Sequence, residues 1–323
     1  MPKNTTFVLG AGFSVDATDP QMPLARELRE RVLRFIEFER HSSYAPHLDK
    51  SWEYPQGQFR AGLQQIDPDG HLQFEELFTE FRRQGVTSDS EGPAYVAEWV
   101  LRIGCARLFW CLHGLNPFPE WCYKNFASRL AQPGSRNMVI SFNWDIVAET
   151  ALVESRIPWS YSLYDPAIVP ILKPHGSINW NSYLRRGFQN DSGLWRPIGP
   201  GSGLSYPAVT PLENPFQQGI NPDLVYALFP GDPDLPEHDE DLKRIWEEAK
   251  IALQGSDRVV FIGYSLPDYD PFASTFFHEH VSSEVEVYNP SEADRQKYKQ
   301  LFGGRIVQEG GRFSSSPYAA SAA

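Results

Sequence analysis

The sequence predicts an α/β fold in which a largely parallel sheet carries helices on both faces and a helical insertion. Short apolar runs that end at glycine or polar residues alternate with longer stretches of helical period. Parallel strands need a crossover, usually a helix, to reach their neighbours, so this alternation favours a parallel sheet. With 41% hydrophobic and 14% aromatic residues, the 323-residue chain can bury a sizeable core. The fold class is therefore Rossmann-like.

The first apolar run, residues 5–10 (TTFVLG), predicts a buried strand that leads into a tight turn. Residues 23–40 carry apolar side chains at helical spacing and charged ones between them, which predicts the helix of a first strand–turn–helix unit. Residues 71–83 and 94–115 are also helical by period. We therefore expect a helical insertion over about residues 41–135.

The second half of the chain repeats the strand and helix pattern. The expected strands are 137–141, 168–172, 258–262, 285–288 and 305–307, and the expected helices are 145–155, 237–254 and 291–302. Residues 184–236 are rich in glycine and proline, and no element can be placed in them. We expect one domain over 1–313 and a flexible, low-complexity tail over 314–323.

Composition excludes several classes of protein. The 29 basic and 41 acidic residues give a formal charge of −12, which argues against general nucleic-acid binding. The sequence shows neither a signal peptide nor a membrane-spanning apolar run, so we expect a cytoplasmic protein. Cys105, Cys111 and Cys122 fit neither a disulfide framework nor a zinc site. His278 and His280 would point to different sides of a helix, so no metal is expected.

Glycine or polar residues follow each of four expected strands. The segments are Gly10-Ala11-Gly12-Phe13-Ser14, Ser141-Phe142-Asn143-Trp144-Asp145, Pro174-His175-Gly176-Ser177 and Gly263-Tyr264-Ser265-Leu266, and Asn289 follows a fifth strand. On a parallel sheet these turns meet at one rim, where ligands bind. The first segment lets backbone N–H groups approach a phosphate, which indicates a nucleotide. The dinucleotide fingerprint is incomplete, since Val15 stands where it has glycine or alanine.

Taken in order, these motifs resemble those of the sirtuin-like NAD hydrolase family, especially its bacterial members that deplete NAD during antiphage defence. Residues 10–14 resemble the family's first NAD loop, and residues 141–145 resemble its Thr-x-Asn-Tyr-Asp strand end. Residues 173–180 (KPHGSINW) look like its Lys-Leu-His-Gly-Ser segment, and residues 260–266 look like its late nucleotide strand. The resemblance covers roughly residues 5–302.

The resemblance implies that His175 is the catalytic histidine and that Asn143 holds the reacting water or a ribose hydroxyl. A neutral imidazole suits a weak base near pH 7, and a carboxamide can both donate and accept hydrogen bonds. Asp145 either steadies developing positive charge or caps the next helix. His175 and Asn143 could also be ordinary turn residues. By the same resemblance the residues expected to bind NAD are Gly10, Ala11, Gly12, Phe13, Ser14, Gly263, Ser265 and Asn289, the last of which could instead be a satisfied loop residue.

The departures from the family matter for function. The four-cysteine zinc ribbon and the Gly-Ile-Pro-Asp-Phe-Arg segment of protein-deacylating sirtuins are missing, and residues 15–23 read VDATDPQMP instead. We therefore expect a hydrolase that cleaves NAD, its substrate, into nicotinamide and ADP-ribose. The alternatives are a non-catalytic NAD or ADP-ribose sensor and an ADP-ribosyltransferase. The family further implies control by homo-oligomer formation or by a partner defence protein, such as an ATPase or a nucleic-acid-guided protein.

Overall fold

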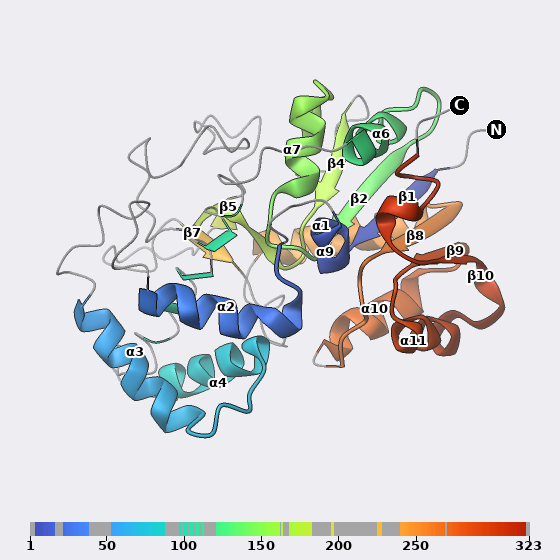
Figure 1. Ribbon diagram of the computed structural model, residues 1–323. Coiled ribbons are helices and arrows are strands. Elements are labelled where there is room, and N and C mark those ends of the chain that lie inside the picture. The colour runs from blue at the N-terminus through green and yellow to red at the C-terminus, as the bar shows by residue number, and fades with distance from the viewer. Residues whose placement is uncertain are drawn as a thin grey trace.

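A seven-stranded sheet forms the centre of the computed structural model (Figure 1). The structure describes residues 4–16, 22–38, 53–87, 121–161, 163, 168–182, 195–196, 225–227, 240–268 and 270–320, with scattered positions between 97 and 112. The strand order is β10 (Ile306–Gly310), β9 (Glu284–Tyr288), β8 (Arg258–Ile262), β1 (Thr5–Leu9), β2 (Asn137–Ser141), β4 (Val169–Leu172) and β3 (Trp159–Ser160). Every adjacent pair in it is parallel. The predicted α/β, Rossmann-like fold class is therefore confirmed.

Strand β1 is the central strand because its five residues, TTFVL, are buried throughout. It pairs with β2 on one side and with β8 on the other. The chain first adds strands on the β2 side and later adds β8, β9 and β10 on the opposite side. The strand order thus reverses beside β1, and ligands of open α/β sheets bind at such a switch point, outside the carboxyl ends of the strands.

Helices cover both faces of the sheet, as the sequence predicts. Figure 1 shows α6 (Trp121–Leu130) and α7 (Val147–Glu154) on one face, and α10 (Pro271–His280) and α11 (Glu292–Phe302) on the other. Helix α9 (Glu240–Gln254) contacts α10. The sequence prediction assumed a helix at His278 and His280 but gave it no bounds, although the start of α10 is well marked. Asp270 caps it by accepting from the backbone N–H of Ala273, and Pro271 occupies the first helical position.

Two helices of the predicted insertion region, α3 (Glu53–Ile66) and α4 (Phe74–Thr87), form a group beside the sheet with α2 (Ala25–Phe38) (Figure 1). The predicted helix 23–40 is therefore present as α2, but it packs on α4, and the helix that directly follows β1 is α1 (Ala11–Val15). The described positions between 97 and 112 are helical and buried, and Gly104 lies directly against the side chain of Ile36 in α2. Helix α6 contacts β2 and α7, so the last part of residues 41–135 packs in the layers of the sheet rather than in this group.

Two features near the carboxyl edge of the sheet go beyond the sequence prediction. Helix α1 (Ala11–Val15) begins directly after β1, ahead of the predicted helix that corresponds to α2. A second sheet with antiparallel pairs joins β6 (Trp195–Arg196), β5 (Gly176–Ser182) and β7 (Val225–Ala227). The rest of the region 184–236 lies outside the described residues.

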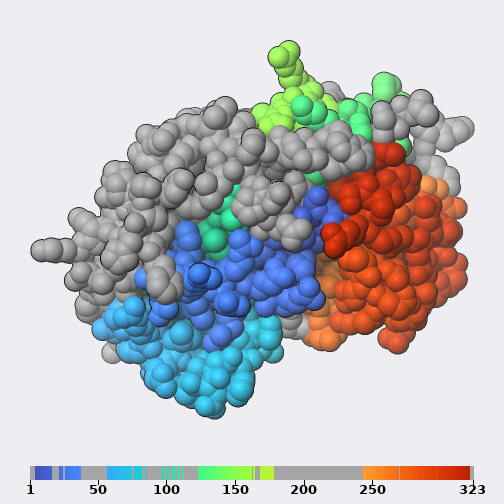
Figure 2. Space-filling model, in the orientation of Figure 1, coloured from blue at the N-terminus to red at the C-terminus, as the bar shows by residue number. Residues whose placement is uncertain are grey.

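The C-terminal segment corrects the expectation of a flexible tail for residues 314–320. Two short 3₁₀ helices, Gly303–Arg305 and Phe313–Ser315, flank β10. Phe313 is 1% exposed and packs against the rings of Phe13, Tyr123 and Phe126. Ser314 donates to the carboxylate of Asp16 through both its backbone N–H and its hydroxyl. Figure 2 shows the C-terminal residues lying against the N-terminal part of the chain. The Ser- and Ala-rich composition predicts mobility, but burial of the Phe313 ring stabilises the ordered segment.

We expect Phe313→Ala to lower the free energy of unfolding by about 3–5 kcal/mol, because it opens a cavity among three aromatic rings. Urea unfolding followed by tryptophan fluorescence measures this change. Tyr318→Phe removes only a hydroxyl, which donates to Glu286 and also contacts Arg258, and about 1 kcal/mol is expected for it. A loss for Phe313→Ala as small as that of Tyr318→Phe would show that the segment is not packed in solution.

Candidate active site

Two backbone loops meet without intervening side chains at the carboxyl ends of β1 and β8. Gly12 N–H donates to the carbonyl of Gly263 at 3.0 Å, and Gly10 N–H donates to that of Ile262 at 3.0 Å. A Cβ at Gly10 would lie 2.4 Å from the Cα of Tyr264, and one at Gly263 would lie 2.3 Å from the nitrogen of Phe13. Gly263 also has φ +63°, which favours glycine. The backbone of the loop after β1 (the first loop) therefore packs directly on the backbone of the loop after β8 (the late loop), and glycines make this close approach possible.

The side-chain amide of Asn143 joins the loop after β2 to the first loop. Its Nδ2 donates to the carbonyl of Gly10 at 2.9 Å and to Oγ of Ser14 at 3.0 Å. Asn143 is 7% exposed, and its Oδ1 takes part in none of the hydrogen bonds among the described residues. The donor end of the amide is thus engaged by protein, and the acceptor end is available for a hydroxyl.

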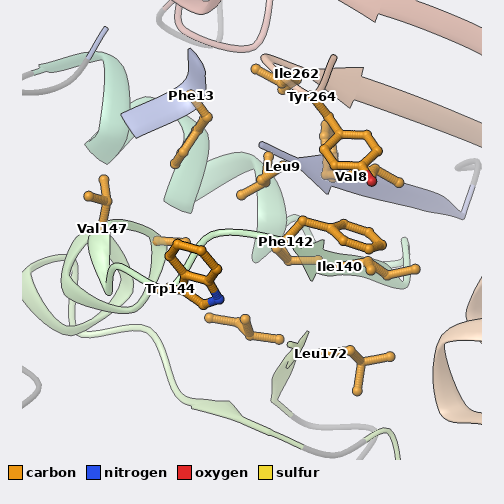
Figure 3. Close-up of a cluster of buried hydrophobic side chains, with 14 of the residues drawn as sticks. Val8, Leu9, Phe13, Ile140, Phe142, Trp144, Val147, Leu172, Ile262 and Tyr264 are labelled. Atoms are coloured by element: carbon orange, nitrogen blue, oxygen red, sulfur yellow. The ribbon is translucent and has the colours of Figure 1, made fainter. Parts of the chain in front are cut away.

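His175 lies beside this loop and is tied to it. The indole Nε1 of Trp144 donates to the carbonyl of His175 at 3.1 Å. The ring of Phe142 meets the imidazole edge-on, with centroids 4.7 Å apart. Figure 3 shows Phe142 and Trp144, which flank Asn143, with Phe142 beside the ring of Tyr264. The neighbours of Asn143 in the chain therefore hold His175 in place, and the two predicted catalytic residues share one site.

Sequence reasoning missed Asp270, the residue that faces the imidazole. Its Oδ2 lies 3.3 Å from Nε2 of His175 and accepts the hydroxyl of Tyr264 at 3.3 Å. Its Oδ1 accepts the N–H of Ala273 at 3.0 Å. Burial opposes ionisation of this 3% exposed carboxyl, but the close contact with the His175 imidazole and the hydrogen bonds from Ala273 and Tyr264 outweigh it and lower the pKa of Asp270. An Asp-Pro pair before an apolar helix was the available signal.

The lowered pKa of Asp270 predicts a pH-dependent contribution to stability. Because the pKa is lower in the folded protein, the stabilisation is present above the unfolded pKa of about 3.9 and is lost as pH falls through the folded value. We expect Asp270→Asn, which keeps a helix-capping side chain, to lower the free energy of unfolding at pH 7 by about 1–3 kcal/mol. The difference from wild type should shrink below about pH 4, as urea unfolding at both pH values would measure. A pH-independent difference contradicts this account.

A buried lysine, Lys173, joins the loop after β2, which carries Asn143, to the segment after β4, which carries His175. Lys173 is 0% exposed, and its Nζ donates to the carbonyl of Asp145, to Oγ of Ser177 at 2.7 Å and to Oε1 of Glu149 at 3.0 Å. Glu149 also accepts the hydroxyl of Tyr161 at 3.1 Å. A buried ammonium with three acceptors is satisfied. This arrangement holds the strand ends that carry Asn143 and His175 at a set separation.

Asp145 has a structural place in the site. Its Oδ1 accepts the backbone N–H of Val147 at the start of α7 at 3.0 Å, and the hydroxyl of Ser14 also bonds to it. Burial raises the pKa of the Asp145 carboxyl, and the nearby Lys173 ammonium only partly offsets it. The N-cap of α7 is Ile146, so Asp145 is not the helix cap that the sequence offered as an alternative, but it lies one residue before the cap and supports the loop.

The other predicted NAD-binding residues divide into two groups. Gly10, Gly12 and Gly263 form the backbone surface described above, Ala11 begins helix α1 between the first two, and Ser265 is partly exposed in the adjoining loop. The side chain of Phe13 is 0% exposed, in the aromatic core. Asn289 is also engaged, because its Nδ2 donates to the carbonyl of Tyr264 at 3.2 Å and its Oδ1 accepts the N–H of Ser291 at 2.9 Å. These contacts favour the loop-residue alternative for Asn289.

Metal and membrane features are absent from the described part of the chain. Among the residues described, no group of three or more histidine, cysteine and acidic side chains could hold a metal ion. Within the same ranges no helix has the length and apolar character needed to cross a bilayer. Among the described residues the site presents the amide of Asn143, the imidazole of His175, the carboxylate of Asp270 and the backbone of the glycine loops.

Comparisons with solved structures find Sir2 enzymes. A structure concerned with the mechanism and regulation of Sir2 enzymes matches with a TM-score of 0.41 and 12% identity, covering 98% of this chain and 88% of that one. A structure of Sir2 with a p53 peptide and NAD⁺ matches with a TM-score of 0.38 and 14% identity, covering 95% and 87%. No family model and no curated protein matches the chain. Similarity at this level does not assign the chain to a family.

Proposed function

We propose that this protein is an NAD⁺ hydrolase that cleaves the bond between nicotinamide and ribose and releases nicotinamide and ADP-ribose. One observation carries the proposal. The amide of Asn143 is bonded to the glycine loop after β1, while the residues on either side of it contact His175. A phosphate-binding type of loop, a hydroxyl-orienting amide and a base therefore adjoin at the switch point of the sheet.

The backbone around Gly10 and Gly12 suits the pyrophosphate of a dinucleotide. Glycines there leave the first loop without Cβ atoms, so its backbone can approach phosphate oxygens closely. Ser265 lies at the adjoining loop and could contact the adenosine half. The nicotinamide ribose would then extend toward Asn143 and His175.

The chemistry of the bond requires few groups. The C1′–N bond breaks, its electron pair goes to the nicotinamide nitrogen, and neutral nicotinamide leaves a ribose that carries positive charge. Asn143 would orient a water or a ribose hydroxyl through its free Oδ1, and His175 would take the proton of the attacking water as the C1′–O bond forms. The products are nicotinamide, ADP-ribose and one proton.

Regulation belongs to the same proposal. Unrestricted NAD⁺ cleavage would starve the host cell, so the enzyme would be held inactive until a trigger arrives. The resemblance of its motifs supports the proposal that it is an effector of bacterial antiphage defence that acts in the cytoplasm by NAD depletion. Control would come from homo-oligomer formation or from a partner defence protein, such as an ATPase or a nucleic-acid-guided protein.

The test is to incubate the purified protein with NAD⁺ and to separate nicotinamide, ADP-ribose and NAD⁺ by chromatography, with and without candidate partner proteins. Stoichiometric nicotinamide and ADP-ribose support hydrolysis. Nicotinamide with ADP-ribose attached to protein would instead identify a transferase. NAD⁺ binding without nicotinamide release in every condition would identify a sensor or scaffold and overturn the proposal.

A further inference from the structure

We propose that Asp270 is the positioning residue that fixes the tautomer of His175, so that Nδ1 of the imidazole is the atom that accepts the proton. The inference deepens the proposed function and rests on it for what the base does. The tautomer itself is a property of the protein and can be measured without any substrate.

Each oxygen of Asp270 has a set of partners. Oδ1 accepts the N–H of Ala273 in the first turn of α10, which anchors the carboxylate to a rigid element. Oδ2 faces Nε2 of His175 and the hydroxyl of Tyr264, each at 3.3 Å. The Asp270 side chain is 3% exposed and lies at the start of α10, which Pro271 begins. Its carboxylate is therefore held in one orientation.

The carboxylate at this position is ionised near neutral pH. Burial alone would favour its acid form, but the contact with the His175 imidazole and the hydrogen bonds from Ala273 and Tyr264 lower its pKa. The N-terminal end of the ten-residue helix α10 also favours negative charge. An ionised carboxylate only accepts hydrogen bonds.

The protonation of His175 follows from its partner. A ring nitrogen that faces an acceptor-only group must carry the hydrogen, so neutral His175 has its hydrogen on Nε2 and its lone pair on Nδ1. None of the hydrogen bonds among the described residues involves Nδ1, and the His175 side chain is 10% exposed. Nδ1 is therefore the atom left to receive a proton, and the resulting imidazolium is stabilised by the same carboxylate.

An asparagine at position 270 would reverse this arrangement. Its Oδ1 would still cap α10 by accepting from Ala273, which leaves the NH₂ group facing Nε2 of His175. That group donates, so it stabilises the tautomer with the lone pair on Nε2 and the hydrogen on Nδ1. Asp270→Asn thus changes one atom, keeps the helix cap and turns the base away from the reacting water.

The experiment is ¹⁵N NMR of the full-length protein with ¹⁵N-labelled histidine, at a pH where His175 is neutral, using His175→Gln to identify its signals. We expect the Nε2–H tautomer in wild type and the Nδ1–H tautomer in Asp270→Asn. Asp268→Asn is the matched control, because Asp268 is an exposed carboxylate whose partner is Lys297, and it should leave the wild-type signals unchanged. An Nδ1–H tautomer in wild type would overturn the inference without using the variant.

Activity provides the second measurement. Where wild type releases nicotinamide, Asp270→Asn should lower kcat by about 10²–10⁴-fold with a much smaller change in KM, as expected for a misplaced base. A variant with the reversed tautomer and unchanged kcat would refute the role of Nδ1. If wild type releases no nicotinamide, the proposed function fails, and the NMR result still decides whether Asp270 sets the tautomer.

Discussion

Replacing His175 with alanine is expected to lower nicotinamide release from NAD⁺ by about 10²–10⁴-fold, the usual effect of removing a general base. The change removes the imidazole at the point where three loops meet, but the backbone carbonyl that accepts from Trp144 remains. Binding of NAD⁺, followed by calorimetry, should therefore change far less than kcat. A loss of both together would mean that the histidine supports the site rather than the reaction.

The matched control is His278→Ala, because His278 is an exposed histidine near the end of α10. It should have wild-type activity and stability. If His175→Ala folds normally and retains the activity of this control, His175 is not the base.

Lys173→Met is expected to lower the free energy of unfolding by about 3–5 kcal/mol, because it leaves Glu149 as a buried charge without its cation. Typical domains are stable by about 5–15 kcal/mol, so the variant should have a much lower urea midpoint, measured by circular dichroism. Methionine fills a similar volume, so packing accounts for little of the loss.

Two further variants separate charge from packing. Adding Glu149→Gln to Lys173→Met removes the orphaned charge and keeps an acceptor for Tyr161, so part of the stability should return. Lys250→Met breaks a partly exposed pair with Glu247, for which less than about 1 kcal/mol is expected. A loss for Lys173→Met no larger than that of Lys250→Met would contradict the burial of the pair.

The strands of the large sheet could be predicted because each is a short apolar run with a marked end. Residues 137–141 and 258–262 coincide with β2 and β8, since both strands are covered on two faces and their sequences show little polar alternation. The runs 137–141 and 168–172 placed Asn143 and His175 at the carboxyl edge. Once the strands are parallel, residues that follow them must lie on one side of the sheet.

Contacts between distant residues could not be predicted in this way. Asp270 lies 95 positions after His175, and their contact joins the start of α10 to the segment after β4. Asn289 is of a residue type that often binds ligands, but its side-chain amide donates to the backbone carbonyl of Tyr264. The C-terminal segment has the composition of a mobile tail, yet Phe313 completes an aromatic cluster that begins at Phe13. In each case a tertiary partner decides the role.

The glycine-to-glycine contact between the first and the late loop has a consequence for how the protein is made. Strand β1 emerges early from the ribosome, but β8, its second neighbour, follows only at residues 258–262. Until then the nascent chain has one unpaired edge along β1, which is open to wrong pairing or to a chaperone. The backbone surface proposed to bind the pyrophosphate takes its final shape only after translation has passed Gly263. A polypeptide that stops earlier would lack this surface and should not cleave NAD⁺.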